Sequence, residues 1–89
     1  MNRGRVFFMR KHFDVKVTWD PEAKMWVADS DDVPGLAAEA PDPDSLVKKL
    51  SVLVPELLEL NHVPVDQKAP VELVLHYHHE ARIQLPHAA

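Results

Sequence analysis

The clearest pattern in the chain is an alternation of apolar and polar positions over residues 13–19, which read FDVKVTW. The apolar parity comprises Phe13, Val15, Val17 and Trp19. Successive side chains of a β-strand point to opposite faces of a sheet. A strict period of two therefore predicts a half-buried strand with its odd-numbered residues toward a core.

Two further strands are predicted after this one. A turn at residues 20–24 has Pro21 at its first corner, where proline fixes the required φ angle. Residues 25–29 (MWVAD) then read as the return strand of a hairpin, and Trp19 and Trp26, which flank this hairpin, are expected to close the core. A break rich in Ser, Asp, Pro and Gly spans residues 30–35. Residues 36–40 (LAAEA) are predicted to form a short third strand, although Ala and Glu favour helices in isolation.

A helix is predicted from residue 43. Asp42 suits the N-cap, and Pro43 suits the first helical position, where its missing N–H is not needed. The apolar stripe comprises Leu46, Leu50, Leu53, Leu57 and Leu60, widened by Val47, Val54 and Leu58. Pro55 should bend the helix, but the stripe continues across it, so one helix is expected. Asn61 can take the left-handed cap conformation, and Pro64 prevents continuation.

A fourth strand of about a dozen residues is predicted over residues 71–83. Its apolar parity comprises Val71, Leu73, Leu75, Tyr77, Ala81 and Ile83. The element order is then β-β-β-α-β, an α+β fold with a four-stranded mixed sheet and one helix packed on one face. Because a single helix covers one face only, the other face should be mostly exposed to water.

Composition agrees with one small domain. The 89 residues are 46% hydrophobic and 27% charged, as in ordinary globular domains. No apolar run approaches the ~20 residues of a membrane span. The absence of cysteine excludes disulfides, thiolate metal sites and a Cys nucleophile. We expect a cytoplasmic protein with a basic arm or strand extension over residues 1–12, one domain over residues 13–84 and a tail over residues 85–89.

The net charge of −4 conceals an uneven distribution. Four of the ten Lys and Arg lie within residues 1–12, so the rest of the chain holds six cations against fourteen carboxylates. Binding to nucleic acid needs clustered Lys and Arg. The acidic body therefore argues against direct nucleic-acid binding, and it favours either a basic protein partner or simply good solubility.

The six histidines raise the question of a metal site. His76, His78 and Glu80 share one parity in the fourth strand, and an H-x-H pair followed by a carboxylate can bind a transition metal. A solvated polar face explains the same pattern, and the spacing reveals no fourth ligand. No Gly-flanked nucleophile and no Gly-rich phosphate loop is present. We predict no catalytic residue and no cofactor, and we keep a metal-dependent hydrolase or nuclease using these three residues as an alternative.

Four short segments carry a family resemblance: Trp19-Asp20-Pro21-Glu22, Trp26-Val27-Ala28, Asp32-Val33-Pro34-Gly35-Leu36 and PELLELN at residues 55–61. Together they resemble the HicB-like antitoxin superfamily, and most closely its short uncharacterised bacterial domains. The resemblance implies a sheet and helix similar to a truncated ribonuclease H fold without its catalytic carboxylates. It also implies a partner, a small basic ribonuclease toxin of the HicA type. Many HicB-type proteins add a C-terminal DNA-binding segment, for which no counterpart is expected after Ile83.

The predicted function is therefore a non-enzymatic module that binds and neutralises such a toxin. The candidate partner surface is the acidic loop, with Asp29, Asp31, Asp32, Val33 and Pro34, because loops on a rigid scaffold often carry binding residues. A plain solvated turn is the competing interpretation. A third reading is a small regulator that binds DNA through the basic N-terminal arm.

A homodimer is also predicted. A thin core gains from further burial, and a long fourth strand should present an edge that either pairs with another chain or must be blunted by charge. Two such strands could pair across a two-fold axis, with Glu80 opposite Arg82 as one register. The helix surface around Val52 and Pro55 is the alternative interface.

Overall fold

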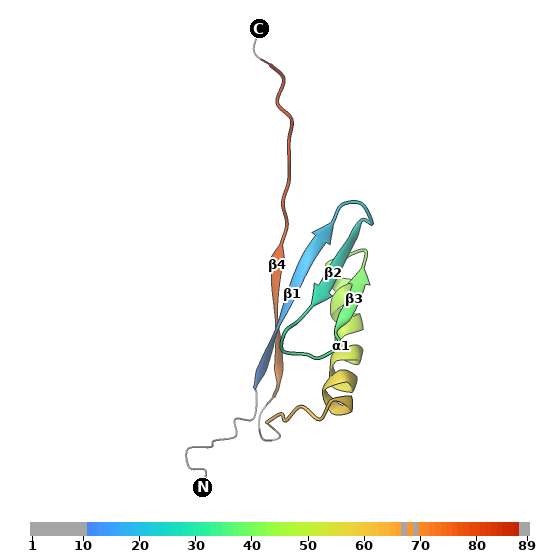
Figure 1. The fold of residues 1–89 in the computed structure, drawn as a ribbon, viewed down its shortest axis with the longest axis vertical. Coiled ribbons are helices and arrows are strands. Elements are labelled where there is room, and N and C mark those ends of the chain that lie inside the picture. Colours follow the sequence, from blue (N-terminus) through green and yellow to red (C-terminus); the bar gives the residue numbers. More distant parts are fainter. Residues whose placement is uncertain (1–10, 67, 69, 88–89) are drawn as a thin grey trace.

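A computed structural model describes residues 11–66, 68 and 70–87. The elements are β1 (His12–Asp20), β2 (Met25–Asp29), β3 (Ala37–Ala40), α1 (Pro43–Leu60) and β4 (Glu72–His78). The four strands form one sheet in the order β3-β2-β1-β4, and α1 lies on one side of it (Figure 1). The predicted α+β fold is thus confirmed, whereas most of the expected basic arm falls outside the described residues.

The central position of β1 determines the topology. β1 pairs antiparallel with β2, placing Val17 opposite Ala28, and parallel with β4, placing Val17 opposite Tyr77. A parallel neighbour requires a long crossover, and α1 supplies it. β3 pairs antiparallel with β2, with Ala38 opposite Ala28. This pairing holds the Ala-rich segment as a strand despite its helical propensity.

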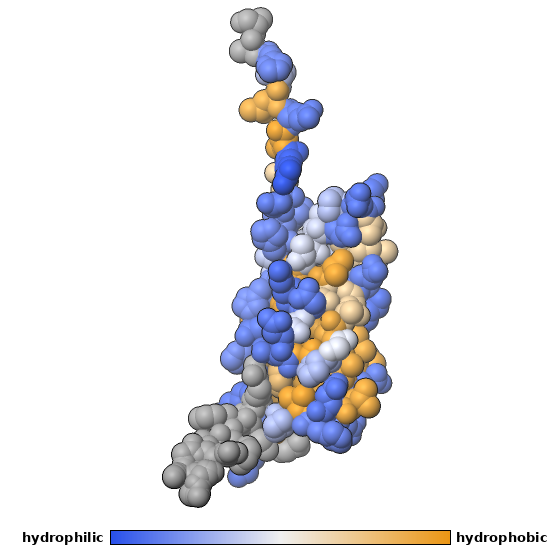
Figure 2. Space-filling model, viewed as in Figure 1, coloured by the Kyte–Doolittle hydropathy of each residue, from blue (hydrophilic) through white to orange (hydrophobic). Residues whose placement is uncertain are grey.

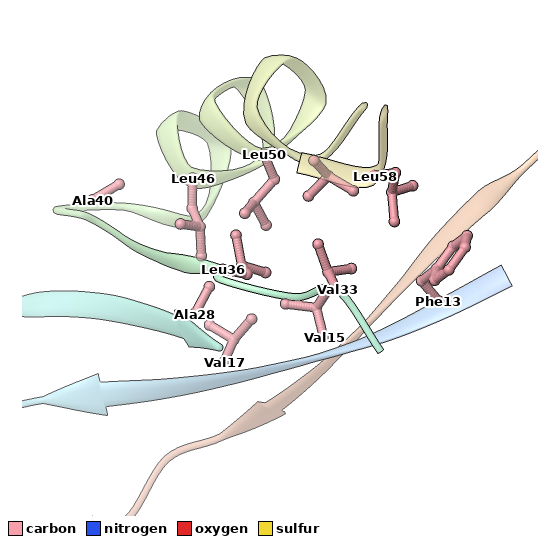
Figure 3. Packing of buried hydrophobic residues seen from close by; sticks show 11 residues of the cluster. Phe13, Val15, Val17, Ala28, Val33, Leu36, Ala40, Leu46, Leu50 and Leu58 are labelled. Atoms are coloured by element: carbon pink, nitrogen blue, oxygen red, sulfur yellow. The ribbon is translucent and has the colours of Figure 1, made fainter. Parts of the chain in front are cut away.

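The core lies between α1 and the sheet (Figure 3). From the sheet, Phe13, Val15 and Val17 are fully buried, as the odd parity predicted. From the helix, the buried residues are Leu46, Leu50, Val54 and Leu58. These follow a spacing of four, so a single helical face supplies the whole helical part of the core.

The ends of α1 show how the local sequence sets its limits. The Asp42 carboxylate accepts a 2.8 Å hydrogen bond from the Ser45 backbone N–H, and Pro43 occupies the first turn. This bond and a second one from the Ser45 hydroxyl hold the pKa of Asp42 below its ordinary value of 3.8. Pro55 lies inside the continuous helix. The left-handed residue at the C-terminus is His62, with φ of 55°, and not Asn61 as predicted.

The fourth strand is shorter than predicted, because it ends at His78 instead of near Ile83. Its only strand neighbour among the described residues is β1, and the ladder stops at the pair Thr18–His78. Residues 79–87 continue in the same direction as an isolated segment that projects beyond the domain (Figure 1). We call this segment the C-terminal arm. Alternation detected the apolar face, but it could not show where the pairing with β1 stops.

Candidate functional site

The acidic loop, residues 29–34, is fixed to β1 by side chains. The Asp14 backbone N–H donates to Asp32 Oδ2 at 2.7 Å, and the Ser30 hydroxyl donates to the Asp14 carbonyl at 2.5 Å. Ser30 Oγ also accepts from the backbone N–H groups of Asp32 and Val33, at 2.9 and 3.1 Å. The β1–β2 ladder reaches Lys16 opposite Asp29. Beyond that pair, the side chains of Ser30 and Asp32 therefore make the hydrogen bonds to β1 that backbone groups make within the ladder.

This anchoring sorts the predicted partner-binding residues into two groups. Asp29, Asp31 and Pro34 are exposed, as a contact surface requires. Asp32 is half-buried and holds β1. Val33 is fully buried in the core, so its inclusion in the surface was wrong. Its place in a polar loop gave no sign that the chain folds back under the helix.

The acidic loop adjoins a polar contact that sequence reasoning did not find. His76 Nε2 lies 2.8 Å from Asp14 Oδ1, and His12 Nε2 lies 3.7 Å from the other oxygen of the same carboxylate. These side chains lie on the sheet face opposite α1, since their parity is the reverse of the buried one. Together with Lys16 and the acidic loop, Asp14 and His76 line a shallow depression. Two features could have predicted the contact: Asp14 and His76 share the outward parity, and their strands pair in parallel.

The proposed metal ligands are not gathered into a site. Among the described residues, no group of three or more His, Asp or Glu side chains is placed to hold a metal ion. His76 contacts Asp14. Glu80 lies beyond the end of β4, where its Oε1 is 3.8 Å from Arg82 Nη2 on the C-terminal arm. The parity argument placed His76 and His78 on one face, but a shared face does not by itself bring a third ligand within reach.

The helix side of the sheet carries a different surface. α1 covers β1 to β3, and it leaves the inward side chains of β4 partly uncovered, with Leu73 and Leu75 half-buried and Tyr77 exposed. An open apolar groove lies between the two elements, lined by Val47, Val54 and Pro55 from α1 and by Leu73 and Leu75 from β4. Apolar surface gathers around this part of the domain, and apolar patches recur along the arm (Figure 2).

Four ring side chains form an aromatic cluster at the end of the β1–β2 hairpin: Trp19, Trp26, Tyr77 and His79. The two indole rings lie 5.1 Å apart, and Trp26 also contacts Tyr77 at 5.5 Å and His79 at 5.6 Å. Trp26 is half-buried and packs against the core, as expected, whereas the ring contacts of Trp19 are with Trp26 and His79. The cluster joins the end of the hairpin to the beginning of the C-terminal arm.

The chain is similar in sequence and in structure to known proteins. Residues 12–85 match the family described as a domain of unknown function, DUF1902, and the chain belongs to that family. A solved structure, that of hypothetical protein TTHA1013 from the extremely thermophilic bacterium Thermus thermophilus, is 43% identical in sequence. That match covers 83% of this chain and 99% of the other, with a TM-score of 0.64. No curated protein matches the chain.

Within the described part of the chain, no helix combines the length and the apolar character needed to cross a bilayer.

Proposed function

We propose that this protein is a non-enzymatic interaction module that binds a small basic protein through the acidic loop, in the manner of a HicB-type antitoxin and its ribonuclease toxin. The observation that carries the proposal is the anchored geometry of the loop. Asp32 and Ser30 are committed to β1, whereas the Asp29 and Asp31 side chains remain exposed. Fixed carboxylates on a rigid sheet suit recognition of a basic partner.

The surroundings strengthen this electrostatic argument. Asp14 adds a further carboxylate beside the loop, within the same shallow depression. The chain as a whole carries fourteen Asp and Glu against ten Lys and Arg. Clustered charge of one sign raises the rate at which an oppositely charged partner is encountered. We therefore expect the complex to weaken as salt is added.

The test is affinity purification from the native host at low and at high salt, with the co-eluting proteins identified by mass. A small basic ribonuclease retained at low salt is the expected result, and its activity should fall when this protein is added. The Asp31→Lys variant should weaken binding at least about tenfold, since one exposed charge is reversed at the contact. The hydrogen bonds that anchor the loop come from Ser30 and Asp32, so the fold of this variant should be retained.

Glu22→Lys is the matched control, because it makes the same charge change in the exposed β1–β2 turn. Equal loss of affinity in both variants would reduce the effect to net charge and contradict a specific surface. Recovery of no basic partner under any salt condition would overturn the proposed function. A metal-dependent hydrolase finds no gathered ligand set among the described residues, and metal analysis of untagged protein tests it separately.

A further inference from the structure

The outer edge of β4 in one copy of the chain is complementary to the C-terminal arm of a second copy. We propose that two protomers pair their β4 strands antiparallel about a two-fold axis at His79. The arm of each protomer would then lie along the β4 edge of its partner. This interface uses the outer edge of β4, whereas the acidic loop is anchored to β1, and it does not depend on the proposed function.

The backbone N–H and C=O groups of β4 alternate between the side facing β1 and the outer edge. The Glu72 N–H donates to the Lys11 carbonyl at 2.9 Å, so even-numbered residues of β4 face β1. Neighbouring residues of a strand direct these groups to opposite sides. Leu73, Leu75 and Tyr77 therefore direct their N–H and C=O groups to the outer edge, where the described residues supply no strand.

The C-terminal arm presents apolar side chains at alternate positions. Ala81, Ile83 and Leu85 continue the parity of the inward side chains of β4. Ile83 and Leu85 are 80% and 81% exposed, although the family match extends through both of them, to residue 85. An isolated extended segment with two large exposed aliphatic side chains is typical of a β-strand that pairs with another chain.

One register pairs the arm of one chain with β4 of the other over the full length of the strand. With the axis at His79, residues 80–86 of one chain run antiparallel to residues 72–78 of the other, which is the whole length of β4. Leu85 then lies beside Leu73, and Ile83 lies beside Leu75. These pairs extend the floor of the apolar groove with further aliphatic surface.

The same register agrees with the remaining side chains. The small Ala81 falls opposite the bulky Tyr77. Pro86 is even-numbered, so the N–H that it lacks would have pointed away from the partner, and no ladder bond is lost. Pairing Glu80 with Arg82 instead would set Leu75 opposite His87, leaving its aliphatic side chain without an aliphatic partner. About 14 backbone hydrogen bonds would join the two chains, two for each hydrogen-bonded pair.

Light scattering at micromolar concentration provides the first test. We expect twice the chain mass of 10.1 kDa, and a mass equal to one chain overturns the proposal. Ala81→Pro removes an N–H directed at the partner, once in each protomer, so it should raise the dimer dissociation constant about 100-fold. Arg82→Pro, one residue away, removes an N–H directed outward and should leave the dimer intact. Equal behaviour of the two variants overturns the pairing.

Cysteine crosslinking tests the register without relying on proline, and the chain has no native cysteine. In His79→Cys the two Cα atoms would face each other at about 5.5 Å, within disulfide range, so a covalent dimer should form under mild oxidation. In Ala81→Cys the two Cα atoms would lie roughly 14 Å apart, so it should stay uncrosslinked. Crosslinking of the second variant and not the first overturns this register.

Discussion

The two halves of this sheet differ in how completely they are covered. Over β1 to β3, one face is buried under α1, and side chains such as Phe13 and Leu50 are 0% and 1% exposed. Over β4 and the C-terminal arm, side chains with the same parity are less covered: Leu73 is half-buried, Tyr77 is 47% exposed and Ile83 is 80% exposed. β1 and β4 carry the same kind of alternating pattern. The difference shows that such a pattern identifies a face to be buried without identifying what buries it.

The largest effect should come from the covered half. Leu50→Ala removes a buried side chain and leaves a cavity between α1 and the sheet, so it should lower the free energy of unfolding by about 2–5 kcal/mol. Val52→Ala, on the exposed side of the same helix, should change it by less than about 0.5 kcal/mol. Denaturant unfolding monitored by circular dichroism measures both. Similar losses would contradict the one-faced packing of α1.

A smaller loss is expected where the acidic loop is anchored. Ser30→Ala removes the hydroxyl that joins the Asp14 carbonyl to two loop N–H groups, so the free energy of unfolding should fall by about 1–2 kcal/mol. Ser51→Ala removes only an exposed hydroxyl that donates to the Val47 carbonyl within α1, and it should have little effect. Unfolding in urea compares the two variants. Equal stabilities would show that the loop is not fixed by Ser30.

In the uncovered half, the effect of a substitution on the free energy of unfolding should decrease with distance from β1. Leu75→Ala, half-buried on β4, should cost about 1 kcal/mol. Ile83→Ala should leave the unfolding free energy of the single chain unchanged within about 0.5 kcal/mol. Both variants should be measured at protein concentrations at which light scattering gives the mass of a single chain. A large loss in Ile83→Ala under those conditions would mean that the arm packs on its own domain.

The smallest effect concerns pH. Because the folded pKa of Asp42 is lowered by the hydrogen bonds from Ser45, its stabilising contribution is present above the ordinary value of 3.8. It is lost as the pH falls below that value and through the lowered one. Asp42→Asn retains an N-cap acceptor without titrating there. Thermal unfolding from about pH 6 to about pH 2.5 should therefore show a smaller decrease in Tm for the variant than for the parent.

Local chemistry made much of the fold predictable. The FDVKVTW alternation identified the buried face of β1, and Asp42 with Pro43 identified the first turn of α1, because these signals act between near neighbours in sequence. The acidic character of residues 29–32 was equally visible. Asp29 and Asp31, two of the three exposed members of the candidate surface, could therefore be named without a structure.

Other features depended on contacts between distant segments. The burial of Val33, the contact between Asp14 and His76 and the end of β4 at His78 all depend on how distant segments of the chain pack together. No local pattern encodes where the pairing of β4 with β1 stops. Which side chains are apolar and which are polar can be read from the amino-acid sequence, since polarity is a property of each residue. Which of them come into contact depends on the fold, because a parallel crossover brings together residues 62 positions apart.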